Sequence, residues 1–216
     1  SATTAHLLVS MPAAGPSPAE PFVASVEFEV GRLLRRGGQD DAAIPHLRAA
    51  MADPATSPRA GFDLALIAFD RQPAMDQAFV AGADPAADRT GAETMFAAGL
   101  HQLRRHEVSQ GIAQLLAAVT RDDWFDTSMR DEARALGSWI ALDAGRADLL
   151  PAMLGPSTPA GEGVDAATRT LLLGRLAATL GDPTQALVEL HSARIELDRR
   201  CGRTHPWTLR AERAVA

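Results

Sequence analysis

The chain has 216 residues, of which 21 are basic and 27 acidic, so its formal net charge is −6. A protein that binds the phosphate backbone of nucleic acids needs a basic face, and this balance argues against that class. The longest plainly apolar run, Leu64–Phe69, is far shorter than the roughly 20 residues that cross a bilayer. The single cysteine, Cys201, cannot form an internal disulfide. We therefore expect a soluble cytoplasmic protein with no direct nucleic-acid or membrane partner.

Amino-acid usage favours helices and indicates a bacterial source. Alanine and leucine dominate the apolar residues, as is typical of closely packed helices. All 21 basic residues are arginine, and lysine, asparagine and tyrosine are absent. These three residue types have AT-rich codons, so their joint absence points to a high-GC bacterial genome and not to an arginine-specific function.

The N-terminal part of the chain predicts a linker followed by two helices. Residues 1–20 contain three prolines and predict a linker. Apolar residues at helical spacing predict a helix over 22–36, which ends at Gly37–Gly38. Asp40 or Asp41 begins a second helix that Pro54 ends. These two helices, joined by a glycine turn, make one antiparallel unit.

The middle of the chain repeats this arrangement less regularly. Apolar spacing predicts helical segments at 63–70 and 74–80, and Thr90 with Glu93 has the spacing of a capping box before a helix over 95–105. A turn near His106 or Ser109 leads into a helix over 111–119. Two more segments, 133–142 and 147–154, precede an insertion that we place at 156–165.

The C-terminal part has the clearest boundary signals. Gly181 ends one helix, Asp182 is suited to cap the next, and Pro183 fits its first turn. Pro206 likewise begins a final helix over 206–216. The result is about five helix pairs and one terminal helix.

Three frames of small residues and leucine recur along the chain. Each begins with a glycine, followed by a small residue 12 positions later, a leucine at 16 and an alanine at 19. The first two glycines are 68 residues apart, which is twice a period of 34. The frames are Gly31, Ala43, Leu47 and Ala50; Gly99, Gly111, Leu115 and Ala118; and Gly174, Ala186, Leu190 and Ala193.

With these residues the chain resembles the tetratricopeptide repeat family, whose 34-residue pattern contains Leu-Gly, two alanines and a closing proline. Val30-Gly31 and Leu173-Gly174 match the Leu-Gly position, and Pro54 matches the closing proline one residue early. The stretch 197–210, with its His-Pro-x-Thr-Leu run at His205–Leu209, looks like the junction of the kinesin-light-chain type of this repeat. This chain departs from the family pattern at the fourth position, where the family has a large residue. The chain has Glu27 there in the first unit and Thr170 in the last.

The resemblance implies an all-α fold, a right-handed α–α superhelix or solenoid. Its helical domain would cover 21–216, with approximate units 22–55, 58–84, 90–122, 127–156 and 164–202 and a final helix 206–216. It also implies a concave groove lined by the first helix of each unit. The residues expected in that groove are Phe28, Arg32, Arg35, Arg36, Phe62, Leu66, Phe69, Phe96, Leu100, Leu103, Arg104 and Arg175.

Three of the expected groove residues, Phe28, Phe62 and Phe96, are spaced 34 residues apart. As a ladder of rings beside arginines they would suit a peptide or partner helix with apolar anchors and carboxylates. The alternative is that they fill the core, as buried phenylalanine usually does. A ladder of rings that binds a peptide predicts a protein–protein interaction scaffold. The alternative function is a sensory or regulatory domain of a larger bacterial signalling or transcriptional protein. A homo-oligomer is compatible with both functions.

Candidate catalytic and metal sites are weak. Cys201 lies four residues before His205 and beside two arginines that could lower its pKa, but no orienting carboxylate accompanies it. His101 and His106 are five residues apart and do not share a helical face, and Gly161–Gly163 lacks a phosphate-loop signature. We therefore expect no enzyme activity, no metal and no cofactor.

Overall fold

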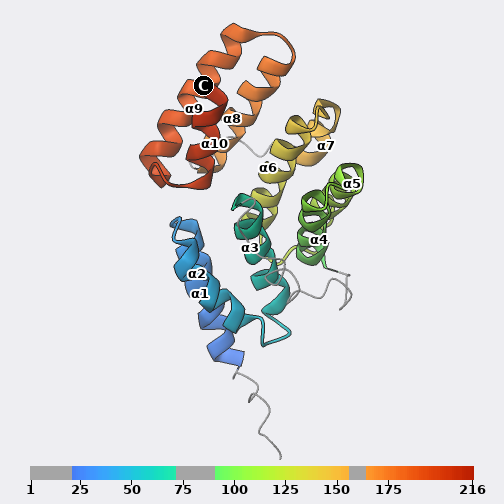
Figure 1. Ribbon diagram of the computed structural model, residues 1–216, viewed down its shortest axis with the longest axis vertical. Helices are drawn as coiled ribbons and strands as arrows, with labels where there is room; N and C mark the ends of the chain where they lie inside the picture. Colours follow the sequence, from blue (N-terminus) through green and yellow to red (C-terminus); the bar gives the residue numbers. More distant parts are fainter. Residues whose placement is uncertain (1–20, 72–90, 156–163) are drawn as a thin grey trace, which may run out of the picture.

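The computed structural model describes residues 21–71, 91–155 and 164–216, and this part of the chain is helical, without strands. In these residues ten α-helices and one short 3₁₀ helix follow one another and pack in adjacent pairs (Figure 1). Their bounds are α1 (Pro21–Arg36), α2 (Asp40–Ala50), α3 (Ser57–Asp70), α4 (Ala92–Arg104), α5 (Val108–Val119), α6 (Thr127–Asp143), η2 (Ala147–Leu149), α7 (Leu150–Leu154), α8 (Val164–Thr179), α9 (Pro183–Cys201) and α10 (Pro206–Val215).

The three glycine frames lie where two helices pack closely against each other. They correspond to the pairs α1–α2, α4–α5 and α8–α9, which have the most extensive helix–helix contacts in the described chain. In each pair the leucine of the second helix lies directly on the glycine of the first, and a Cβ built on that glycine would lie 2.7–2.9 Å from the leucine side chain. Any larger residue would therefore push the helices apart. These pairs are Gly31–Leu47, Gly99–Leu115 and Gly174–Leu190.

Several helices begin earlier than the sequence pattern predicts. α3 begins at Ser57 instead of 63, and α6 begins at Thr127 instead of 133. In α3 the first turn contains Pro58, which suits a position where the backbone N–H would be unpaired. Three predicted segments lie outside the described residues: the helical segment 74–80, the linker 1–20 and the insertion 156–165. The last two residues of the insertion are an exception, because they belong to the start of α8.

The predicted helix caps are correct in part. Asp182 caps α9 by accepting a hydrogen bond from the backbone N–H of Gln185 at 3.0 Å, as predicted. Thr90, the other predicted cap, lies outside the described residues; Gly91 occupies the N-cap position of α4, and the carboxylate of Glu93 accepts a hydrogen bond from the N–H of Phe125. Asp40 and Asp41 lie inside the first turn of α2, where carboxylates favour the helix dipole without capping it.

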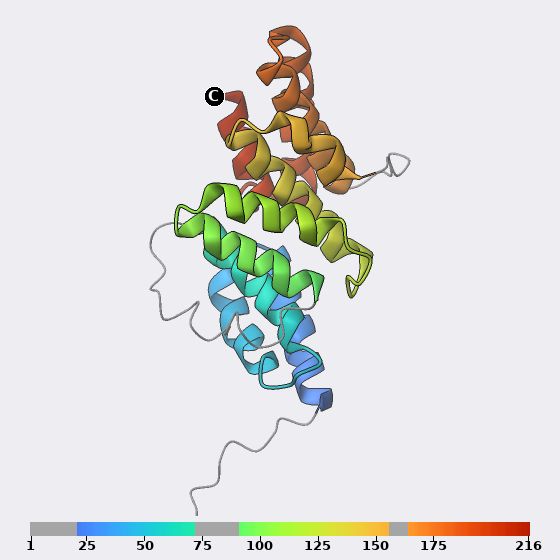
Figure 2. The ribbon, with the colours of Figure 1, turned by 90° about the vertical axis from the view of Figure 1, so that its right-hand side faces the viewer.

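The buried apolar residues form separate clusters, and α3 lies between the two largest. Ala60, Leu64 and Ile67 of α3 pack with α1 and α2, whereas Phe62 and Leu66 on another face pack with the helices that follow. As a result, α1 and α2 form an N-terminal core together with one face of α3. This end of the long axis lies opposite α8 and α9, as Figures 1 and 2 show.

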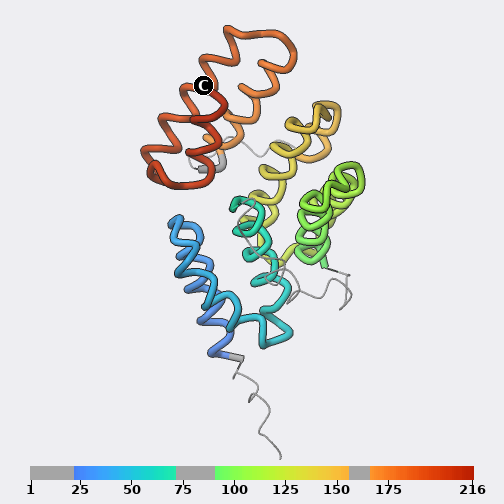
Figure 3. Tube along the Cα trace, in the orientation of Figure 1, coloured from blue at the N-terminus to red at the C-terminus, as the bar shows by residue number. Residues whose placement is uncertain are grey.

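The turn between α1 and α2 lies beside the turn between α9 and α10 (Figure 3). A Cβ at Gly38 would be 3.7 Å from the backbone oxygen of Thr204, so the two turns are in near contact. An ion pair between Arg210 of α10 and Asp70 of α3 also joins these distant parts of the sequence. The first and last helices thus meet around α3 and α6.

Candidate functional site

The three phenylalanines expected to form a ladder are completely buried, each with 0% exposure. Phe62 and Phe96 are neighbours, with ring centroids 5.5 Å apart, and both rings contact Trp124 at 5.6 and 6.1 Å. Phe28 belongs to the separate N-terminal cluster, where the guanidinium of Arg59 covers its ring at 5.0 Å. The burial agrees with the core alternative, and the rings do not form one continuous strip.

The other apolar residues predicted for the groove also belong to the core. Leu66 and Leu100 are buried, and Phe69 and Leu103 pack against the same cluster. The aliphatic part of the predicted binding surface therefore serves to hold α3, α4 and α5 together. Whether a partner contacts any of these residues stays a prediction.

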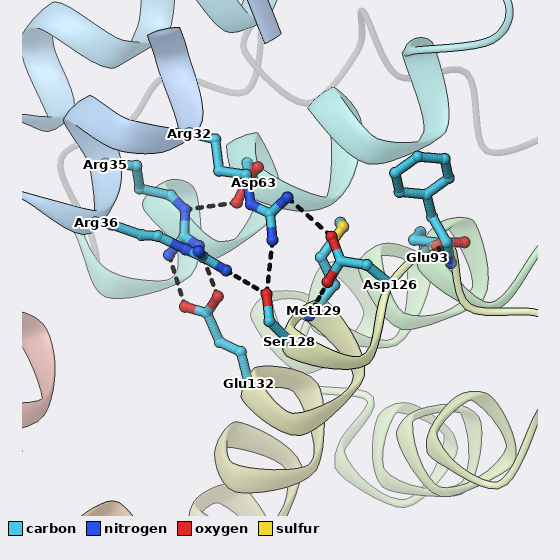
Figure 4. A network of polar contacts seen from close by, with 10 residues as sticks. Arg32, Arg35, Arg36, Asp63, Glu93, Asp126, Ser128, Met129 and Glu132 are labelled. Carbon is cyan, nitrogen blue, oxygen red and sulfur yellow. Dashed lines mark hydrogen bonds and ion pairs between the residues drawn. The ribbon is translucent and has the colours of Figure 1, made fainter. Parts of the chain in front are cut away.

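The predicted arginines divide into two groups. Arg175 forms an ion pair with Asp143 at 2.7 Å, and its guanidinium covers the ring of Trp139 at 4.1 Å, so it joins α8 to α6. Arg104 is half-buried near the end of α4. Arg32, Arg35 and Arg36 come together on one side of α1, where they meet carboxylates from α3 and α6 (Figure 4).

At the centre of this cluster Arg35 is held by two carboxylates. Its Nη1 and Nη2 each donate a hydrogen bond of 2.7 Å to one oxygen of Glu132. Its Nε lies 2.6 Å from Oδ1 of Asp63, an ion pair whose N–H does not have the direction of a hydrogen bond. Both residues of that pair are buried. The fork geometry of the guanidinium matches the carboxylate of Glu132 and fixes its orientation.

Arg32 and Arg36 bind the first turn of α6. Arg32 lies 2.8 Å from Asp126 and donates a hydrogen bond of 2.6 Å to the hydroxyl of Ser128. Arg36 donates a hydrogen bond of 2.5 Å to the same hydroxyl. Asp126 is also the N-cap of α6, because it accepts a hydrogen bond from the N–H of Met129 at 2.7 Å.

The ionisation of the cluster reflects both burial and pairing. Burial raises the pKa of Asp63 above its ordinary value, and the positive charge of Arg35 only partly opposes this. For Glu132, burial also acts to raise the pKa, but the charge and hydrogen bonds of Arg35 outweigh it and hold the pKa below its ordinary value. The carboxylates of Asp63, Asp126 and Glu132 formally balance the charges of Arg32, Arg35 and Arg36. Pairing of this kind is what permits charged groups to be buried.

A small cavity adjoins this cluster where α1, α3, α6 and α10 meet. It encloses about 20 Å³, room for about one water molecule. Charged and apolar groups share its wall, and burial lowers the pKa of His205 there. The lining residues are Arg35, Leu66, Asp70, Glu132, Leu136, His205, Pro206, Trp207 and Arg210.

Sequence reasoning found the three arginines but missed the groups that bind them. Glu132 lies 97 residues from Arg35, and Ser128 lies 96 from Arg32, so no local pattern connects them. Asp63 carried a signal, because it is the one charged residue in the otherwise apolar run from Gly61 to Phe69. A charged residue in such a run indicates a buried ion pair.

The catalytic and metal candidates gain no support. Burial raises the pKa of the Cys201 thiol, and the opposing effect of the positive charge of Arg200 is smaller. The neighbouring arginines therefore do not lower this pKa below its ordinary value. Among residues 21–71, 91–155 and 164–216 there is no group of three or more histidine, cysteine or acidic side chains placed to hold a metal ion. Within the same ranges, no helix combines the length and apolar character needed to cross a membrane.

The opposite side of α1 is apolar and exposed. Phe22 is 76% and Leu33 67% exposed, and Val23 and Val26 are close to half exposed. With Val30, the positions 23, 26, 30 and 33 are spaced by three, four and three residues, which gives one continuous strip along the helix. We call these five residues, Phe22, Val23, Val26, Val30 and Leu33, the outer strip of α1.

A scan of known protein families finds no family model that matches the chain. Searches of curated proteins and of solved structures also find no significant match. The function must therefore be inferred from the residues of the chain itself.

Proposed function

We propose that the protein is an interaction scaffold built as a tetratricopeptide-like superhelix, and that the outer strip of α1 binds a helix of a partner protein. The superhelix is supported by the three glycine–leucine contacts, which fall in the pairs α1–α2, α4–α5 and α8–α9. The first two glycines are 68 residues apart, twice the 34-residue period of that repeat, and the third follows after 75. The scaffold is supported by the outer strip, the observation that carries this proposal.

The outer strip has the character of a contact surface. Contiguous exposed apolar residues on a folded domain typically mark protein–protein contacts. A spacing of three and four residues presents side chains that fit between those of a second helix. An amphipathic helix of another protein is therefore the occupant that best fits the strip.

The proposal differs from the groove expected from the sequence in where the partner binds. Phe28, Phe62 and Phe96 are buried, so their rings are inaccessible to a partner without rearrangement. Phe22 and Leu33 of α1 are by contrast exposed. A regulatory domain of a larger protein remains the alternative function, and the identity of the partner distinguishes it from a scaffold.

Affinity capture followed by reconstitution with the purified partner tests this proposal. We expect wild-type protein to bind the partner and the double variant Phe22→Ser, Leu33→Ser to lose at least about tenfold in affinity. A matched control is Leu180→Ser, Leu187→Ser, which removes two exposed leucines at the other end of the molecule. Equal loss in both double variants, or full binding by the α1 variant, would contradict the assignment of the surface.

A further inference from the structure

We infer that the arginine cluster of α1 is a second binding site, for an acidic protein segment, which the start of α6 occupies in the isolated chain. This site lies on the opposite side of α1 from the outer strip, and the inference does not depend on the function proposed for that strip. Three observations support it: the way α6 fills the site, the polar nature of the contact and its charge balance.

The start of α6 is bound in the manner of a ligand. Asp126 and Glu132 are six residues apart, and Ser128 lies between them, so one short segment supplies every α6 group that meets the three arginines. The bidentate hydrogen bonds of Arg35 to Glu132 are the geometry with which arginine recognises carboxylates in complexes. The occupant therefore defines the chemistry that the site accepts.

The contact between α1 and α6 is made by polar groups. Among the described residues, no buried apolar cluster contains residues of both helices, because α1 belongs to the N-terminal core and α6 to the clusters that follow α3. Met129, Ala133 and Leu136 of α6 are buried in the main cluster, so an incoming segment replaces the carboxylates of Asp126 and Glu132 on α1 and not the apolar contacts of α6. Arg36 is exposed and offers an incoming segment its first point of contact.

The charge balance determines which ligand can replace α6. Without the α6 carboxylates, Arg32, Arg35 and Arg36 would face only Asp63, a formal excess of two positive charges. Buried or partly buried charges are tolerated only when they are paired, so a neutral or basic segment could not take this place. An acidic segment with two carboxylates restores the balance. The contact with α6 then acts as an autoinhibitory one that an acidic partner must outcompete.

The test supplies the proposed ligand in trans. A fluorescently labelled peptide that copies residues 122–136 is titrated at low salt, with anisotropy as readout, against wild type and against Glu132→Gln, which weakens the internal ligand. We expect the variant to bind the peptide about tenfold more tightly than wild type does, the equivalent of one charge-assisted hydrogen bond. The matched control peptide carries Asp126→Asn and Glu132→Gln and should not bind. The protein variant Arg32→Gln, Arg36→Gln should also fail to bind the acidic peptide.

Equal binding of the acidic and control peptides, or equal affinity of wild type and Glu132→Gln, would overturn the inference and leave the cluster as a purely structural one. If Glu132→Gln does not fold by circular dichroism, hydrogen exchange of wild type decides. The acidic peptide should speed amide exchange in residues 127–132 and the control peptide should not, and no difference between them is the overturning result. The Phe22→Ser, Leu33→Ser variant should bind the acidic peptide as wild type does, so a failure of the outer strip is distinguishable from a failure of this site.

Discussion

The two sides of α1 reverse the usual relation between polarity and burial. On the inner side Arg32 and Arg35 are buried with only 9% exposure, whereas on the outer side Phe22 is 76% exposed. The buried charges are stable because carboxylates of α3 and α6 pair with them. The exposed apolar residues have no such explanation within the described chain, which makes the outer side the more informative one for function.

The largest expected effect separates two phenylalanines of the same helix. Phe28→Ala should destabilise the fold by about 3–5 kcal/mol, because Phe28 is fully buried in the N-terminal core. Phe22→Ala should change stability by no more than about 0.5 kcal/mol. Urea unfolding followed by circular dichroism measures both. Similar losses would mean that the outer strip is covered within the chain itself.

A second comparison concerns two arginines of the inner side. Arg35→Met should cost about 3–5 kcal/mol, since it leaves Asp63 and Glu132 without their guanidinium. Arg36→Met removes one hydrogen bond of an exposed side chain and should cost less than about 1 kcal/mol. The same unfolding experiment applies. An Arg35 variant as stable as the Arg36 variant would show that the cluster does not hold α1 to α6.

A third comparison tests the side of α1 that faces α2. Gly31→Ala should cost about 1–3 kcal/mol, because the new Cβ would lie 2.7 Å from Cγ of Leu47. Gly61→Ala in α3 meets nothing within 4 Å and should stabilise the helix by about 0.5–1 kcal/mol. Opposite shifts of the thermal midpoint are expected. A neutral Gly31→Ala would indicate that α1 and α2 are not held at this distance.

The smallest expected effect is a pH dependence of the stability that the inner side of α1 contributes. The pKa of Glu132 in the folded protein lies below its usual value near 4.5. Its contribution to folding stability is therefore present above pH 4.5 and is lost as the pH falls through the folded pKa. Each unit of lowering corresponds to about 1.4 kcal/mol. The stability difference between wild type and Glu132→Gln should therefore shrink between pH 6 and pH 3. Asp63 acts in the opposite direction because its pKa is raised, in part by the charge of Glu132, so the loss of that charge weakens the opposing effect in the variant. A constant difference across this range would contradict the lowered pKa.

The fold was predictable where a single local rule determines it. The spacing from Gly31 to Leu47 predicted a close helix pair, because only glycine leaves room for the leucine above it. Asp182 and Pro206 marked helix starts for similarly local reasons. The early start of α3 was missed, since the prediction began only where its apolar run begins.

Only the arginine residues of the candidate site were predictable from the sequence. The three arginines of α1 share a helical face, so the sequence groups them, but their partners depend on how α6 is placed relative to α1. The equal spacing of Phe28, Phe62 and Phe96 gave no information about exposure, since a core position and a groove position of a helical repeat can share the same period. Trp124, which joins two of these rings, lies in a loop outside any periodic pattern.

By itself, the sequence determined the helices, their closest pairs and the residues that form each face of α1, because these follow from periodicity and side-chain size along a few turns. The tertiary structure decided which of those faces is buried. The first and fourth helical units meet through Arg35 and Glu132, 97 residues apart, and that meeting places charges inside while leaving Phe22 and Leu33 outside. Burial is a property of the assembled helices, so it was fixed only when α6 and α10 came to lie beside α1 and α3.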